Sequence, residues 1–70
     1  MISGYCTVYS EEYKREVWPE AFVSVPRVGE MVQSKDGCAL QVVMVTHLLV
    51  KRDGIERPEI EVELHPGAYK

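Results

Sequence analysis

Four side chains of the kinds that bind zinc are spread along the chain. They are two cysteines and two histidines: Cys6, Cys38, His47 and His65. A structural zinc ion takes four such ligands in a tetrahedron, usually from closely spaced pairs such as Cys-x-x-Cys, and the sequence has no such pair. A small secreted protein that relies on disulfides usually carries four or more cysteines. We therefore expect no metal and no other cofactor, and two buried free thiols rather than a disulfide.

His47 is also a candidate general base, with Glu61 or Glu63 on a neighbouring strand to orient its ring. A histidine followed by apolar residues in a strand more often has a structural role. The sequence shows no serine or cysteine nucleophile at a recognisable turn. A chain of 70 residues also builds a thin core, which leaves little room for a deep pocket that excludes water. The sequence therefore predicts a protein that is not an enzyme.

Polar and apolar residues alternate strictly over residues 59–65, with Ile60, Val62 and Leu64 on one side. This period of two predicts a half-buried β-strand. The acidic side, which begins at Glu59, could contribute to a cation site. A solvated face that discourages edge-to-edge aggregation, or cross-strand pairing with lysine or arginine, explains it without a ligand.

Residues 39–50 form a long stretch rich in β-branched residues, which predicts a second strand. Both of its sides are apolar: Leu40 and Val42 share one side, and Val43, Val45 and Leu49 the other. Either the strand bends, so that its inward side changes along its length, or the second side packs against another protein chain. We favour the bend, because coiled strands are common in small barrels.

Two Asp-Gly pairs predict turns, because glycine tolerates positive φ. Asp36-Gly37 predicts a short hairpin turn before the long strand. Asp53-Gly54 lies within residues 51–58, which we expect to form an exposed, mobile loop longer than a tight hairpin.

The N-terminal third contains one strand, over residues 3–9, and a segment with two competing interpretations. Residues 11–18 suit a short helix capped by Ser10 and ended by Pro19. They equally suit a second strand from Tyr13 to Trp18. Residues 25–30 contain proline and glycine and predict an irregular linker.

Three segments together resemble a known layout: P-x-x-G-x-x-V from Pro26 to Val32, V-x-x-V-x-H from Val42 to His47, and the alternating acids of residues 59–64. The layout is that of small SH3-like β-barrel proteins of bacteria and phages, many of them uncharacterised, and the match covers residues 22–65. The resemblance implies an all-β, five-stranded, partly open SH3-like barrel. Because such barrels usually open with a hairpin, it also favours a strand at residues 13–18; the alternative is an α+β fold with a short helix near residues 11–18. It implies no particular function.

The length of 70 residues predicts a single domain over residues 1–70, and hydropathy predicts that it does not enter a membrane. The net charge is −3, and no apolar run approaches the ~20 residues of a membrane-spanning helix. The first residues lack the basic and apolar regions of a signal peptide, so we expect a cytoplasmic protein.

Two function classes remain. The first is a small binding module for another protein or for a second copy of itself, supported by the two-sided apolar strand and by aromatic residues near the chain ends, among them Tyr69. Its candidate binding surface comprises Tyr13, Trp18, Val43, Val45, His47, Leu49, Lys51 and Arg52. If the chain self-associates, Val45→Glu or Leu49→Glu is expected to yield a folded monomer. The alternative is a nucleic-acid binder that uses the basic loop from Lys51 to Arg57 and surface tyrosines, against which the net charge counts.

Overall fold

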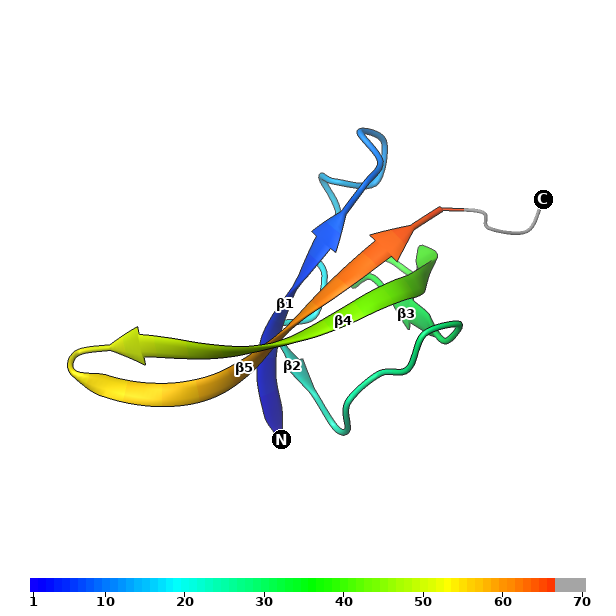
Figure 1. Ribbon diagram of the computed structural model, residues 1–70. Coiled ribbons are helices and arrows are strands. Elements are labelled where there is room, and N and C mark those ends of the chain that lie inside the picture. Colours follow the sequence, from blue (N-terminus) through cyan, green and yellow to red (C-terminus); the bar gives the residue numbers. More distant parts are fainter. Residues whose placement is uncertain (67–70) are drawn as a thin grey trace.

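Five β-strands make up the regular structure of residues 1–66, the part of the chain that the computed structural model describes (Figure 1). They are β1 (Ile2–Val8), β2 (Ala21–Phe22), β3 (Met31–Gln33), β4 (Ala39–Arg52) and β5 (Ile55–His65). These residues contain no helix, and hence none long and apolar enough to span a membrane. The predicted all-β class is confirmed, and the alternative with a helix near residues 11–18 is wrong.

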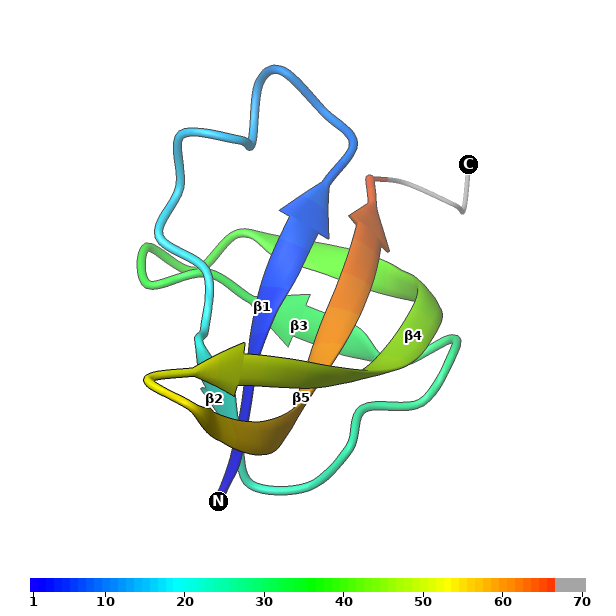
Figure 2. The same cartoon turned by 60° about the vertical axis from the view of Figure 1, so that its left-hand side comes forward.

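The strands lie side by side in the order β2-β1-β5-β4-β3. The sheet curls into an incomplete ring, around which the strands follow one another in the order of the sequence (Figure 2). The pairing of β1 with β5 closes the ring, and the gap lies between β2 and β3. Neighbouring strands are antiparallel except β1 and β5, which are parallel. Strands that alternate in direction around a ring of five must leave one parallel pair. The architecture is thus the predicted partly open barrel and is consistent with an SH3-like fold.

The core lies on the inner side of this curled sheet. It consists of eight buried apolar residues: Val8, Phe22, Val32, Leu40, Val42, Ile60, Val62 and Leu64. The alternation predicted for residues 59–65 is confirmed, because all three of its apolar residues belong to this set. Phe22, expected in the core, is there. Trp18 and Tyr13 are partly buried and pack against the cluster.

A β-bulge explains why both sides of β4 are apolar. The pairing of β4 with β5 shifts between Val42 and Met44, so that Val43 is an extra residue in the ladder. Before the shift Val42 faces the core, and after it Val45 packs against the core. The predicted bend, with its change of inward side, is confirmed.

The segment from Tyr13 to Trp18 is not a strand, contrary to the prediction. The amide of Lys14 donates to the Ser10 carbonyl (3.0 Å) and the amide of Glu16 to the Tyr13 carbonyl (3.1 Å), which makes tight turns. The indole Nε1 of Trp18 donates to the same Tyr13 carbonyl at 2.9 Å, so this acceptor is used locally rather than across a sheet. The strand that pairs with β1 is instead the short β2.

Residues 51–58 do not form the predicted long loop. β4 continues to Arg52 and β5 begins at Ile55, so only Asp53 and Gly54 make the turn. Both have positive φ, 53° and 78°, as a two-residue type I′ hairpin turn requires. The other Asp-Gly prediction is confirmed, since Asp36-Gly37 lies in the turn that joins β3 to β4.

Candidate interaction site on the hairpin arm

The far ends of β4 and β5 project from the barrel as a two-stranded arm (Figure 1). We call residues 49–58 the hairpin arm. It makes the molecule long and narrow, with extents of 43 × 22 × 19 Å. None of the eight core residues comes from the arm, and each of residues 51–58 is exposed. An isolated two-stranded hairpin is only marginally stable in water.

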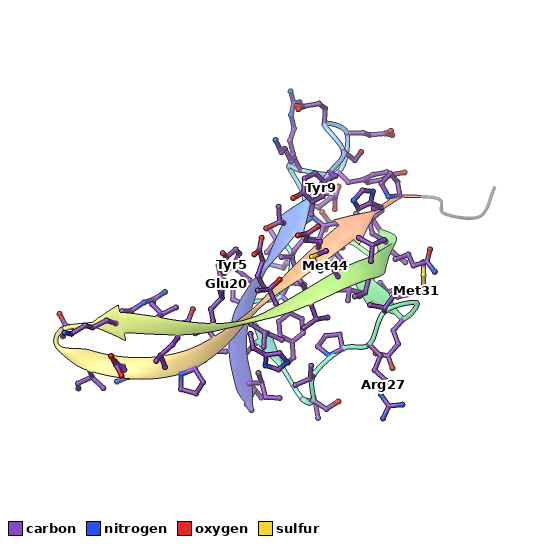
Figure 3. All side chains as sticks on the ribbon, in the orientation of Figure 1. Tyr5, Tyr9, Glu20, Arg27, Met31 and Met44 are labelled. Atoms are coloured by element: carbon purple, nitrogen blue, oxygen red, sulfur yellow. The ribbon has the colours of Figure 1, made fainter. Side chains whose placement is uncertain are left out.

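Apolar side chains stand exposed on both faces of the arm. The ladder places Leu49 and Lys51 opposite Pro58 and Glu56 on one face, while Val50 and Arg52 lie opposite Arg57 and Ile55 on the other. Leu49 is 67% exposed and Ile55 is 54% exposed. Figure 3 shows side chains standing out from both faces of the arm, away from the barrel. Such exposed aliphatic groups are the kind that a protein partner covers.

The two long edges of the arm are also unpaired within the described residues. β1 covers β5 only from Ile60 to Leu64, and β3 covers β4 only from Ala39 to Gln41. The loop before β3 adds two backbone hydrogen bonds at Val42. The Gly29 amide donates to the Val42 carbonyl, and the Val42 amide donates to the Glu30 carbonyl. Beyond that point β4 has a free edge.

Pro58 shows which backbone groups face the free edge of β4. Antiparallel ladders alternate between pairs that exchange two hydrogen bonds and pairs that exchange none. Pro58 has no N–H, so its pair with Leu49 is of the second kind. The N–H and C=O groups of Leu49 therefore point away from β5, as do those of His47 and Lys51 two residues to either side.

An open groove of about 530 Å³ lies at the base of the arm. Its apolar walls come from the start of β1, the loop before β3 and the base of the hairpin: Met1, Ile2, Val25, Pro58 and Ile60. His47 and Arg52, both predicted site residues, line the same groove. The structure thus brings two residues of the predicted binding surface, His47 and Arg52, to one groove that apolar residues also line.

An ion pair joins the arm to its base. Nη2 of Arg52 lies 3.4 Å from Oε2 of Glu59, whose side chain is only 10% exposed while that of Arg52 is 66% exposed. Glu59 is thus buried, although the sequence placed it on a solvated face. The alternative considered for these acids, pairing with a basic residue across the hairpin, describes Glu59 correctly.

The carboxylates proposed to orient His47 do not lie on its face of the sheet. His47 lies opposite Ile60, whereas Glu61 lies opposite Thr46 and therefore on the other face. Glu61 instead accepts a hydrogen bond from Oγ1 of Thr7 at 2.8 Å. The structure does not bring together the acid–base pair considered from the sequence.

The candidate binding residues fall into two groups. His47, Leu49, Lys51 and Arg52 lie on the arm or at its base. Tyr13 and Trp18 lie elsewhere, in the turn after β1, and Trp18 adjoins the end of β3. Val43 is the bulge residue, and Val45 packs against the core rather than facing outward. Tyr69 lies outside the described residues.

The four residues first considered as zinc ligands lie on different elements. Cys6 is on β1, Cys38 precedes β4, His47 is at the base of the arm, and His65 ends β5, where its ring lies 4.9 Å from that of Tyr9. Over residues 1–66 no three histidine, cysteine or acidic side chains gather in a way that could hold a metal ion. The cysteines are free, as expected, but half-buried rather than buried.

The thiol of Cys6 is held in its protonated form. Its Sγ donates to the Pro19 carbonyl at 3.6 Å. Burial raises the pKa of Cys6 from 9.0 to about 11, because desolvation disfavours the thiolate. A nucleophilic cysteine needs the opposite shift, so this thiol is suited to packing rather than to reaction.

Comparison of the chain with protein-family models, with curated proteins and with solved structures finds no match. Function is therefore inferred from the geometry of the chain itself. The sequence does not predict the arm, because the composition of residues 51–58 indicates a loop. The signal that could have revealed it is the pair of β-prone residues Ile55 and Val50 on either side of Asp53-Gly54.

Proposed function

We propose that this protein is a small non-catalytic binding module whose ligand is a protein chain, and that the hairpin arm is its contact surface. The observation that carries the proposal is the exposure of Leu49 and Ile55 on an arm that contributes nothing to the core. Aliphatic side chains on a projecting hairpin give a partner both apolar area and unpaired backbone.

The charges near the arm favour a protein over a nucleic acid. Its basic residues Lys51, Arg52 and Arg57 are interspersed with Asp53 and Glu56. A nucleic-acid surface needs basic residues gathered on one face, and here Lys51 lies on one face of the arm and the two arginines on the other.

The surroundings of Tyr5 also favour a protein over a nucleic acid. Tyr5 shares a notch with Arg52, but Glu20 and the buried Glu59 line it as well (Figure 3). These carboxylates repel a phosphate backbone.

The chemistry of the groove supports binding rather than catalysis. Glu61 and Glu63, the carboxylates considered as partners of His47, lie on the other face of the ladder, and burial keeps the Cys6 thiol protonated. The groove at the base of the arm is partly open to solvent, whereas most catalytic pockets exclude water.

The test is a pull-down from the native host with three immobilised proteins: the wild type, Leu49→Glu and Val28→Glu. Leu49 and Val28 are each 67% exposed, but Val28 lies in the loop before β3, so Val28→Glu is the matched control. We expect a protein retained by the wild type and the control, and depleted at least ten-fold by Leu49→Glu. Circular dichroism checks that all three are folded.

The proposal fails if no retained protein, including the chain itself, depends on Leu49. It also fails if labelled oligonucleotides bind more tightly at low salt and this binding is lost in Lys51→Ala/Arg52→Ala, because the ligand is then a nucleic acid.

A further inference from the structure

We infer that the chain covers the arm with a second copy of itself, paired edge to edge through β4 about a two-fold axis. This inference rests on the proposed function, since it names the partner of the same surface. It follows from which edge is open, from the side chains that edge brings together, and from the distribution of charge along the arm.

Of the two edges of the arm, only that of β4 offers regular hydrogen-bonding groups. On β5 the outward positions are Glu56 and Pro58, and Pro58 lacks the N–H that a new strand would need. On β4 the outward N–H and C=O groups of His47, Leu49 and Lys51 are all available to a neighbour. Natural sheets protect exposed edges with proline and charge; both edges carry a charged residue, Lys51 on β4 and Glu56 on β5, but only β5 carries a proline.

An antiparallel pairing centred on Leu49 is self-complementary. Leu49 then lies opposite Leu49 of the second copy, and Lys51 opposite its His47. On the other face Leu48 lies opposite Val50 and Val50 opposite Leu48. The central rows across the new four-stranded ribbon are apolar, and on the first face Pro58 of each copy extends the Leu49 row outward.

The same pairing places unlike charges near one another. The tip of the arm, residues 51–57, carries three basic and two acidic side chains, whereas the base carries the acidic Glu59 and Glu61. An antiparallel arrangement sets the tip of one arm beside the base of the other. Arg52 then lies opposite Thr46 of the second copy, which is itself paired with Glu61. Such complementarity favours the antiparallel register over a parallel one.

Two-fold symmetry makes the contact close on itself. Each copy uses the same residues and meets them in the other copy, so the association stops at two chains. Pairing both arms also turns a marginal two-stranded hairpin into a four-stranded sheet, which is a more stable unit.

Cysteine cross-linking tests the register directly, in a Cys6→Ser/Cys38→Ser background. In the inferred dimer, the Cα atoms of residue 49 in the two copies lie about 5.5 Å apart. This distance is within the range of about 4.4–6.8 Å between the Cα atoms that a disulfide joins. Leu49→Cys is therefore expected to form a cross-linked dimer on mild oxidation. Ile55→Cys is the matched control on the same arm, because it would lie roughly 25 Å from its counterpart. We expect at least a ten-fold higher dimer yield at position 49.

Light scattering gives the second measurement. The wild type is expected to show twice the chain mass of 8.0 kDa over a dilution series. Leu49→Pro removes one outward N–H without removing a bond to β5, and is expected to show the single-chain mass while keeping its β circular dichroism.

A wild type that stays at the single-chain mass, or equal cross-linking at positions 49 and 55, would overturn the inference. If the wild type is a monomer but Leu49→Glu still loses a host protein in the pull-down, the self-pairing is wrong and the proposed function stands. If the wild type is a monomer and no host protein depends on Leu49, both are wrong.

Discussion

Gly4 shows how closely two strands approach inside this small barrel. A Cβ atom built at this position would meet the carbonyl oxygen of Ile60 and lie 2.6 Å from its Cγ1. Gly4 pairs with Ile60 where β1 lies parallel to β5, and its amide donates to the Glu20 carbonyl at 3.1 Å. Position 4 therefore has no room for a side chain, because the atom in the way belongs to the backbone of Ile60 and cannot move aside as the end of a flexible side chain could.

Gly4→Ala is expected to lower the free energy of unfolding by about 2 kcal/mol, because the added methyl forces β1 away from β5. Urea denaturation measures this change. Ser3→Ala, at an exposed position on the same strand, is the control and should change it by less than ~0.5 kcal/mol. Equal stability of Gly4→Ala and the wild type would show that the strands are less tightly paired than described.

Cys6 gives a second prediction at this scale. With a pKa near 11 instead of 9.0, its thiolate fraction below pH 9 is about 100-fold lower than that of an ordinary thiol. Iodoacetamide is therefore expected to label Cys6 at least about 100-fold more slowly in the folded chain than in the urea-unfolded chain. Peptide mass spectrometry measures the two labelling rates. Similar rates in the two states would contradict a buried, protonated thiol.

The sign of the pH effect on stability follows from the same shift. The folded chain binds this proton more tightly than the unfolded chain does. The contribution to stability is therefore fully present below pH 9 and is lost as the pH rises through 11. A Cys6→Ser variant lacks this group and should not show that loss.

At the scale of elements, the arm is separable from the barrel. Residues 49–58 supply no core side chain, and the pair Leu48/Glu59 just below them is a hydrogen-bonded pair by the alternation that Pro58 sets. A two-residue Asn-Gly turn fits after such a pair. The fold therefore does not require the arm, which is consistent with a role in binding.

Replacing residues 49–58 by Asn-Gly is expected to leave the β circular dichroism and a cooperative thermal transition intact while abolishing self-association. The cost is about 1–3 kcal/mol, from the lost Arg52–Glu59 pair, because Glu59 is mostly buried while Arg52 is largely exposed. A shortened chain that does not fold would show that the arm is part of the folding unit.

At the scale of the whole molecule, the eight-residue core makes each inward contact important. Val45 packs against that core, whereas Leu49 lies on the arm beyond it. The expectation that either residue can become glutamate in a folded chain therefore holds only for Leu49. Val45→Glu places a charge against the core.

Val45→Glu is expected to lower the midpoint of urea unfolding strongly, by an amount equivalent to about 2–3 kcal/mol, and Leu49→Glu to leave it within ~0.5 kcal/mol. Both variants are measured under dissociating dilution, so that a lost dimer does not contribute. If the two variants were equally stable, Val45 would be a surface residue after all.

Several features were predictable from the sequence because their causes are local. The period of two over residues 59–65 sorts apolar from acidic side chains whatever surrounds the strand. Glycine at Asp36-Gly37 and Asp53-Gly54 allows the positive φ of a turn. Two apolar sides on one strand pointed to the change of inward side, which the bulge between Val42 and Met44 produces.

Other features depend on contacts between distant residues, and only the tertiary structure decided them. Residues 51–58 form a ladder rather than a loop because each residue pairs across the hairpin, which composition does not show. Residues 11–18 are turns because the Trp18 indole and a nearby amide share the Tyr13 carbonyl. The apolar and acidic pattern thus determined which residues form the inner side of the barrel. Tertiary packing determined that β3 ends short of the arm, which leaves the far edge of β4 without a neighbouring strand among residues 1–66.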